Sequence, residues 1–300
     1  MDVVFHEGYD FSASTLMDVP FDTNKHSRIA GLLGSRAISF HRPDAISREH
    51  LLLVHTATHI DSLDDPGVMA SILENDYIRH IPRNAVRDGV LSPFLLMTGG
   101  TLLAARLAMA HGMAANLGGG LHHAQPRFGS GFCPVNDVAV AIHTLLRDES
   151  ISRAIVIDTD VHQGNGTAAI FHTEPRVFTL SLHEQAIFPD PKAQSDLDVS
   201  FGPGMGDEEY LELLNRHLHR VLDRHEPDIA FHVAGSDMHA DDALAHGTMT
   251  GEGIARRDEL VMRECGNRGI PYVQVLAGGY FAGSAGVHAG SLANLAEITV

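Results

Sequence analysis

The chain has 300 residues, of which 44% are hydrophobic, and its 38 acidic against 21 basic side chains give a net charge of −17 with histidine neutral. A chain of this length and composition can bury a large core, which argues against intrinsic disorder. The charge argues against binding to DNA or RNA, because an acidic surface repels the phosphate backbone. A cationic substrate suits this charge better.

Cysteine use and the absence of a targeting signal predict a cytoplasmic protein. The N-terminal residues lack the basic region and long apolar run of an export signal, and apolar stretches are interrupted before the ~20 residues of a membrane span. The two cysteines, Cys133 and Cys265, exclude a disulfide framework and suit a reducing compartment. Because no repeat or linker divides the sequence, we also expect a single domain over residues 1–300.

Apolar runs typical of strands alternate along the chain with segments of helical period. The strand-like runs are, in chain order, 3–5, 37–40, 115–117, 154–158, 177–182, 229–234 and 272–276. The helical segments are 98–111, 136–147, 207–225 and 251–267. This alternation predicts an α/β fold with a parallel sheet covered by helices on both faces.

Four of these runs deliver histidine, aspartate or tyrosine at or just beyond their carboxyl ends. In chain order these residues are His122, His123, Asp158, Asp160, His162, Asp237 and Tyr280. Ligands of parallel sheets bind beyond the carboxyl ends of the strands, so one shared site is the simplest explanation. Glycines at three of the four ends permit the turns and close backbone approach that such a site needs.

The spacing of Asp160 and His162 predicts part of a metal site. Residues two apart in extended chain point the same way, so a carboxylate and an imidazole can converge on one cation. A catalytic zinc ion takes three protein ligands and leaves one position open, and Asp237 is the natural third ligand. The alternative is that Asp160 and His162 merely cap a helix that begins near Gly164, but the other strand ends favour a metal.

The adjacent residues His122 and His123 have three interpretations: metal ligands, a proton-transfer pair, or structural histidines bonded to the backbone. Beside a zinc ion, a pair of imidazoles would move protons to and from water and a leaving amine. Tyr280 has two interpretations, a packed aromatic ring or a hydroxyl that donates to a developing oxyanion.

The sequence resembles the zinc-dependent histone deacetylase superfamily over nearly its whole length. The segments that carry the resemblance, in the order of that family, are 118–124, 131–137, 157–166, 181–183 and 277–280. Segments 98–101 and 253–261 are most similar to the class IV branch. The resemblance implies an arginase/deacetylase fold and one catalytic zinc ion.

Carried over by position, the resemblance implies a role for each strand-end residue. Asp160, His162 and Asp237 would be the zinc ligands. His122 and His123 would be the catalytic pair, and Tyr280 would supply the hydroxyl that polarises the carbonyl. Asn165 stands where some branches carry an aspartate as the partner of His123. A neutral partner leaves an imidazole less basic, so His123 is the stronger candidate for the general base.

The resemblance also implies a structural potassium ion. Asp158 would orient His122 and help to hold this ion, together with Ser181 and the backbone at Asp160, His162 and Leu182.

Four further residues match the family's narrow tunnel for an acylated lysine. Phe132 and Phe188 would form its aromatic walls, Leu244 would lie near its mouth, and the carbonyl of Gly131 would accept the substrate amide N–H. Without the resemblance, core packing would be the better interpretation of both phenylalanines. We find no match for the acidic residue that holds the substrate backbone in other branches.

These observations predict hydrolysis of N-acyl-lysine amides, in a protein or peptide, with one zinc ion. The nearest alternative is the same chemistry on acylated polyamines or another small acylated amine. An arginase-like hydrolase would need ligands for two manganese ions, whereas the sequence supplies ligands for one catalytic ion. An acyl-lysine binder without turnover would lack a metal ligand or the tyrosine, and both are present. The sequence leaves the oligomeric state and the acyl chain length open.

Overall fold

The computed structural model describes residues 1–11, 19–34 and 38–298. The described strands form one eight-stranded sheet in the order β2-β1-β3-β8-β7-β4-β5-β6, and every neighbouring pair is parallel. The strands are β1 (Asp2–Val4), β2 (Ser39–His41), β3 (Met113–Asn116), β4 (Ala154–Asp158), β5 (Val177–Glu184), β6 (Leu197–Phe201), β7 (Ile229–Val233) and β8 (Tyr272–Val275).

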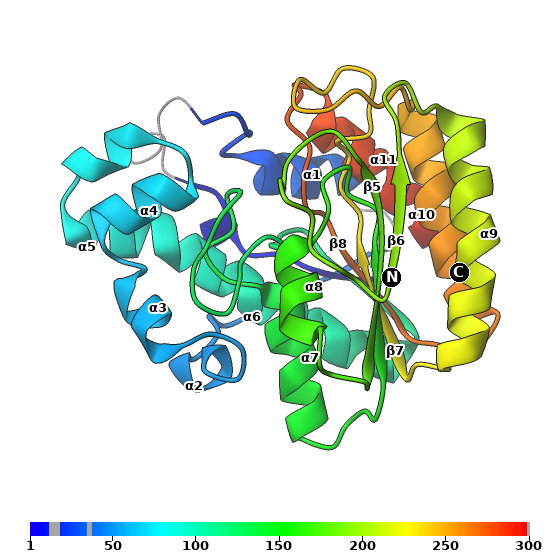
Figure 1. Ribbon diagram of the computed structural model, residues 1–300, viewed down its shortest axis with the longest axis horizontal. Coiled ribbons are helices and arrows are strands. Elements are labelled where there is room, and N and C mark those ends of the chain that lie inside the picture. Colours follow the sequence, from blue (N-terminus) through cyan, green and yellow to red (C-terminus); the bar gives the residue numbers. More distant parts are fainter. Residues whose placement is uncertain (12–18, 35–37, 299–300) are drawn as a thin grey trace.

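Helices cover both faces of the sheet. In Figure 1, α9 and α10 lie on one side of the sheet, and α7 and α8 lie on the other. The helices around the sheet are α1 (Lys25–Leu33), α6 (Ser92–His111), α7 (Asp137–Arg147), α8 (Asn165–Phe171), α9 (Asp207–His225), α10 (Gly251–Gly266) and α11 (Ser284–Ile298). The predicted α/β fold with a covered parallel sheet is confirmed.

Short helical segments form a group at one end of the molecule, away from α9 and α10 (Figure 1). They are α2 (Arg48–Leu51), α3 (Ala57–Ser62), α4 (Pro66–Ile72) and α5 (Arg83–Val86). Short 3₁₀ and π segments at Asp76–His80 and Arg87–Leu91 belong to the same part of the chain, and a further 3₁₀ segment at Glu7–Tyr9 contacts α1 and α6. The sequence does not predict these segments, because one or two helical turns give too short a hydrophobic period.

The core is divided by the sheet into two main layers. Side chains alternate along a strand, so Ile155 and Ile157 of β4 pack with α9 and α10, whereas Val156 packs with α6 and α7. Strands buried on both faces in this way are almost continuously apolar, which is why β4 and β7 were predicted with nearly correct bounds.

Three elements depart from the predicted pattern. The edge strand β6 has no continuous apolar run, because its apolar residues alternate with exposed polar residues such as Asp198 and Ser200. The search for apolar runs therefore missed it. Helix α11 was missed because it is rich in small residues and buried over most of its surface, so it lacks a polar stripe. The strand predicted at 37–40 is observed at Ser39–His41, and Ala37 lies outside the described residues.

One stretch of the described residues, Arg83–His111, is long and apolar enough to cross a membrane. In this fold 61% of its most apolar window is buried inside the protein. Helix α6 forms most of this stretch and packs against β3 and α7. The stretch therefore has the surroundings of a core helix.

The topology brings the four polar strand ends together. Strands β3, β8, β7 and β4 are consecutive in the sheet and run in the same direction. Their carboxyl ends therefore form one continuous edge, and the residues that follow them meet there.

Candidate active site and metal centre

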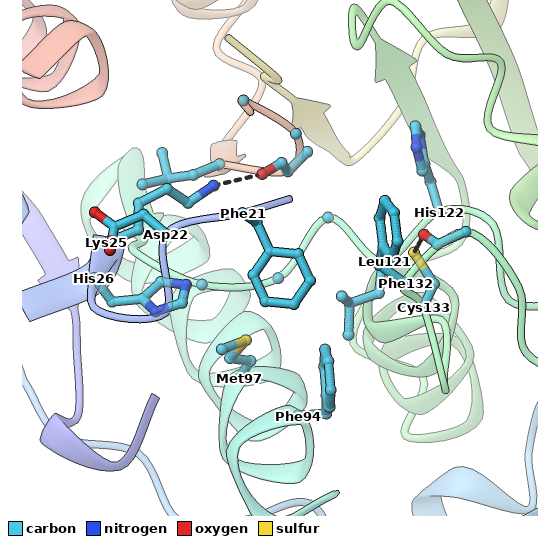
Figure 2. Close-up of a pocket in the computed structure, with 18 of the residues that line it drawn as sticks. Phe21, Asp22, Lys25, His26, Phe94, Met97, Leu121, His122, Phe132 and Cys133 are labelled. Carbon is cyan, nitrogen blue, oxygen red and sulfur yellow. Dashed lines mark hydrogen bonds between the residues drawn. The ribbon is translucent and has the colours of Figure 1, made fainter. Parts of the chain in front are cut away.

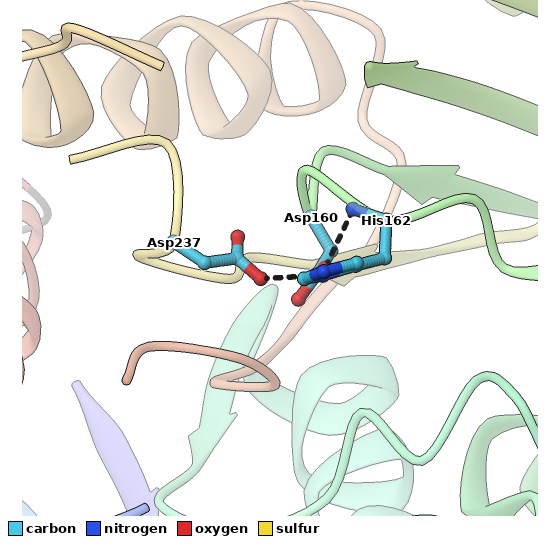
Figure 3. Close-up of side chains that lie close together, drawn as sticks. All are labelled: Asp160, His162 and Asp237. Atoms are coloured by element: carbon cyan, nitrogen blue, oxygen red, sulfur yellow. Dashed lines mark hydrogen bonds and ion pairs between the residues drawn. The ribbon is translucent and has the colours of Figure 1, made fainter. Parts of the chain in front are cut away.

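Asp160, His162 and Asp237 form a buried cluster beyond the ends of β4 and β7. Their possible donor atoms all lie within 4.8 Å of one another (Figure 3). Nδ1 of His162 is 3.2 Å from Oδ1 of Asp160 and 3.2 Å from Oδ2 of Asp237. The three residues are 1%, 7% and 0% exposed. This arrangement presents two carboxylates and one imidazole to a common point.

Backbone amides hold the two carboxylates of this cluster. The N–H of Gly278 donates to Oδ2 of Asp160 at 2.9 Å, and the N–H of Val161 donates to Oδ1 of Asp237 at 3.0 Å. The interpretation of Asp160 and His162 as helix caps is wrong, because α8 begins at Asn165 and its N-cap residue makes no side-chain cap. The strand ends therefore bring the donor atoms of these side chains together.

The charges of the cluster suit a cation. Burial and the neighbouring carboxylate of Asp160 raise the pKa of Asp237 to about 7. Burial also opposes the charged form of His162, but hydrogen bonds to Asp160 and Asp237 outweigh it and raise its pKa to about 10. Two neighbouring, buried carboxylates thus stabilise a positive charge between them. Oxygen and nitrogen donors in this number fit a zinc ion with one open coordination position.

His122 and His123 lie side by side next to this cluster, with their ring centroids 4.0 Å apart. Nδ1 of His122 donates to Oδ2 of Asp158 at 2.8 Å, and Nδ1 of His123 donates to Oδ1 of Asn165 at 2.9 Å. Both rings thus bond to side chains, which disagrees with their interpretation as structural histidines bonded to the backbone. In each imidazole Nδ1 makes this hydrogen bond, so Nε2 is not bonded to Asp158 or Asn165.

The two histidines differ in basicity because their partners differ. Burial lowers the pKa of His122, but the carboxylates of Asp158 and Asp160 outweigh burial and raise it to about 9. Burial and the nearby His122 and His162 hold the pKa of His123 well below its usual value, and the neutral amide of Asn165 does little to oppose them. The pair therefore combines a protonated imidazole with a neutral one.

Tyr280 follows β8 and lies in the same pocket. Its ring centroid is 6.1 Å from that of His162 and 5.8 Å from that of Phe132. Its backbone N–H donates to Asp242 at 2.7 Å, which fixes the residue without using its hydroxyl. Burial and the carboxylates of Asp160 and Asp237 raise the pKa of the hydroxyl well above its usual value, so this group is a proton-bearing donor at neutral pH.

The four predicted substrate residues lie around the opening of this pocket. Phe188 and Leu244 are 42% and 38% exposed and line the opening together with Gly131 and Phe132. The ring of Phe188 stands edge-on to His123, with centroids 4.9 Å apart. Core packing is therefore the wrong interpretation of Phe188, whereas the half-buried Phe132 packs against both Phe21 and Tyr280.

The loop at Gly131 has little room for other residues. Gly131 and Phe132 have φ angles of 52° and 64°, in the left-handed region. A Cβ atom at Gly131 would lie 2.5 Å from the ring of His123, so only glycine fits there.

The carbonyl of Gly131 accepts from the thiol of Cys133 at 3.2 Å. Burial raises the pKa of that thiol, so Cys133 has the character of a packed residue.

The residues of the predicted potassium site are neighbours in the sheet. Asp158 of β4 pairs in register with Ser181 of β5, and Leu182 follows on the same strand. The hydroxyl of Ser181 lies 3.0 Å from Nδ1 of His183.

A cavity of about 90 Å³ is lined in part by His122, His123 and Tyr280. Figure 2 shows Lys25, Asp22 and His26 at one side of it and His122, Phe132 and Cys133 at the other. Nζ of Lys25 donates to the carbonyl of Ala277 at 2.8 Å. Burial lowers the pKa of Lys25 to about 8, although nearby carboxylates oppose this change.

Sequence reasoning missed residues that hold the site in place. Asp242 accepts from the backbone N–H groups of Tyr280 and Leu244, and Asp137 accepts from those of Gly120 and Leu121, just before the histidine pair. Asp137 lies within a segment that resembles the family, but nothing in the sequence connects it with the glycine loop. Lys25 stands in a polar segment with no motif.

Comparison with known proteins identifies the family. Residues 20–295 match the histone deacetylase domain family. The chain belongs to the histone deacetylase family. Histone deacetylase 2 of Arabidopsis thaliana is 34% identical to this family member over 99% of the chain and 79% of the plant protein. An uncharacterized protein of Picosynechococcus sp. is 45% identical over 64% of each protein, so the chain spans just under two thirds of that relative.

A solved structure supports the fold of this family member. The crystal structure of the HDA15 HD domain matches 99% of the chain and 91% of that domain, with a TM-score of 0.81 and 21% sequence identity. The resemblance inferred from the sequence is thus confirmed for the superfamily, and the class IV branch stays a prediction.

Proposed function

We propose that the protein is a zinc-dependent hydrolase that removes acyl groups from lysine side chains. The observation that carries this proposal is the buried Asp160–His162–Asp237 cluster beside a pair of histidines of unlike basicity. Family membership supports a hydrolase of the deacetylase type. Among the described residues this is the single group of three or more metal-ligating side chains, which disfavours an arginase-like centre with two metal ions.

Asp160, His162 and Asp237 would hold the zinc ion. When bound, zinc supplies a Lewis acid that polarises the acyl carbonyl and makes a nearby water more acidic. The potassium ion stays part of the proposal, with Asp158, Ser181 and Leu182 around it.

The histidine pair would move the protons of the reaction. Because the amide oxygen of Asn165 accepts a hydrogen bond, Nδ1 of His123 carries a proton and Nε2 keeps a lone pair. Nε2 of His123 can therefore take a proton from water as the water oxygen bonds to the acyl carbon. His122, protonated beside Asp158, can give a proton to the lysine nitrogen as the carbon–nitrogen bond breaks. The products are a carboxylic acid and a free lysine amine.

The Tyr280 hydroxyl would stabilise the oxyanion that forms on the attacked carbonyl. We expect Tyr280→Phe to lower kcat by ~10²- to 10³-fold, as loss of one preorganised donor does. The unfolding temperature should hardly change, because the ring and the backbone contact to Asp242 remain. Both quantities are measured on one preparation, with the exposed Tyr77→Phe as the matched control. Nearly normal turnover of a destabilised protein would instead assign Tyr280 a packing role.

The substrate class is tested by steady-state assay of the zinc-loaded protein. The panel consists of lysine peptides with acyl groups from acetyl to long-chain, and of acylated polyamines. The exposed Phe188 and Leu244 at the opening suit a side chain that enters from a larger molecule, so kcat/KM should be highest for peptides. Faster hydrolysis of polyamines would identify a small-molecule amidohydrolase, and tight binding without hydrolysis would identify an acyl-lysine binder.

A further inference from the structure

A fully buried arginine lies behind the candidate metal centre. Arg257 is on α10 and is the largest fully buried side chain of the described residues. Its neighbour Arg256 points to solvent and pairs with Glu208. A buried guanidinium is costly unless its charge is balanced and its N–H groups are hydrogen bonded. The partners of Arg257 therefore indicate its role.

The guanidinium of Arg257 joins the two strand ends that carry the candidate ligands. Its Nη1 donates to the carbonyl oxygen of Gly235 at 2.6 Å and to that of Thr159 at 3.2 Å. Thr159 directly precedes Asp160, and Gly235 lies two residues before Asp237. One nitrogen atom thus links the loop after β4 with the loop after β7.

Gly235 packs directly against the carboxylates of this metal centre. A Cβ atom at Gly235 would lie 2.2 Å from Oδ2 of Asp160 and 2.9 Å from Oδ1 of Asp237. No side chain therefore stands between the backbone that Arg257 holds and the candidate ligands. A shift of this backbone would change the separation of the two carboxylates.

Asp258 balances the charge of Arg257 and fixes its position. Oδ1 of Asp258 accepts from Nε of Arg257 at 2.8 Å. Oδ2 of Asp258 accepts from Nε2 of Gln274 at 3.0 Å and from the hydroxyl of Ser291 at 2.6 Å. Gln274 belongs to β8 and Ser291 to α11, so two other elements hold the ion pair of α10.

A chain of hydrogen bonds closes this network into a ring. The hydroxyl of Tyr272 donates to Gln274 at 3.0 Å and lies 2.6 Å from Nδ1 of His232. Nε2 of His232 lies 2.8 Å from the hydroxyl of Thr159, the residue whose carbonyl Arg257 holds. Nε and Nη1 of Arg257 are hydrogen bonded, whereas Nη2 lies 2.7 Å from Oδ1 of Asp258 in the ion pair without making a hydrogen bond. Contacts on two sides, to Asp258 and to the two backbone carbonyls, give the guanidinium a defined place.

We propose that Arg257 is a positioning residue for the metal centre, which sets the separation of Asp160 and Asp237 by holding the carbonyls of Thr159 and Gly235. This inference rests on the proposed function, because it takes Asp160, His162 and Asp237 as metal ligands. The planar guanidinium offers several donors in fixed directions, which the compact ammonium of a lysine does not reproduce. Loss of the guanidinium therefore loosens the spacing of the carboxylates.

The test uses two variants and one control on the full chain. Arg257→Lys keeps the positive charge beside Asp258. The paired variant Arg257→Met/Asp258→Asn removes both charges, so neither is left buried without a partner. Arg256→Met removes the exposed neighbouring arginine and serves as the control. For each protein we would measure the zinc affinity by chelator competition, the visible absorption of the Co²⁺-loaded form, and the unfolding temperature without metal.

Both Arg257 variants should bind zinc ~10- to 100-fold more weakly, as loss of a group that orients metal ligands does. Their Co²⁺ absorption should also change, because it reports the arrangement of the ligands, whereas Arg256→Met should resemble the wild type. A lower unfolding temperature with wild-type affinity and spectrum would overturn the inference, since it would give Arg257 a purely structural role. If the paired variant does not fold, Arg257→Lys decides. Failure of the wild type itself to bind zinc would instead refute the proposed function.

Discussion

The Asp237→Ala variant should lose both its zinc and its hydrolytic activity. Asp160 and His162 would remain as two donors, and a zinc ion held by two protein ligands exchanges readily. The loss of affinity should exceed the ~10- to 100-fold that removal of an outer partner causes. Zinc content per chain after dialysis and kcat/KM for an acetyl-lysine peptide measure the two effects.

Stability with and without zinc separates loss of the metal from loss of the fold. A ligand that binds only the native state raises the unfolding temperature, so zinc should raise that of the wild type and leave that of Asp237→Ala unchanged. Without zinc the variant loses the hydrogen bond from the buried N–H of Val161, so its unfolding temperature should fall, although removal of one of two crowded, buried carboxylates offsets part of this loss. The control is Asp241→Ala, since Asp241 belongs to the same loop and its side chain is 78% exposed. Undiminished zinc content in Asp237→Ala would contradict the ligand assignment.

Two simple regularities of parallel sheets allow the sequence to predict which residues meet at the site. Parallel strands place their carboxyl ends at one edge, so residues after different strands meet, and side chains two apart in extended chain share a direction. Asp160, His162 and Asp237 follow from these regularities, and the structure brings them together. The long, buried strands and the amphipathic helices α7 and α9 were also predictable, since their patterns repeat over several residues.

The groups that hold the site could not be predicted in this way. Arg257 is 98 residues from Thr159 in sequence, and Asp242 is 38 residues from Tyr280. A periodic pattern shows which face of an element is buried but does not show which distant polar group meets it. In the sequence Arg257 is one of two adjacent arginines on a helix. In the structure its hydrogen bonds to the backbone that follows β4 and β7 distinguish it from the exposed Arg256.

The His123→Ala variant should keep its zinc and lose most of its activity. His123 is not among the three ligand side chains, so zinc content should stay at the wild-type level. The rate of amide hydrolysis should fall by the ~10²- to 10⁴-fold that loss of a general acid or base costs. Zinc content and kcat are measured together, with His172→Ala, which removes an exposed histidine after α8, as the control. If zinc is lost with His123, the histidine belongs to the metal centre and the proposed proton transfer is wrong.

The pH profile shows whether His123 acts as the base. A general base works only when it is unprotonated, so the rate should fall at low pH as His123 takes up a proton. The low pKa of His123 places this fall well below neutral pH. Asn165→Asp would put a carboxylate against Nδ1, where Oδ1 of Asn165 now accepts at 2.9 Å, and would raise the pKa of the imidazole. The acid limb of kcat/KM should therefore move to higher pH in Asn165→Asp. An acid limb that stays in place would mean that a different group accepts the proton from water.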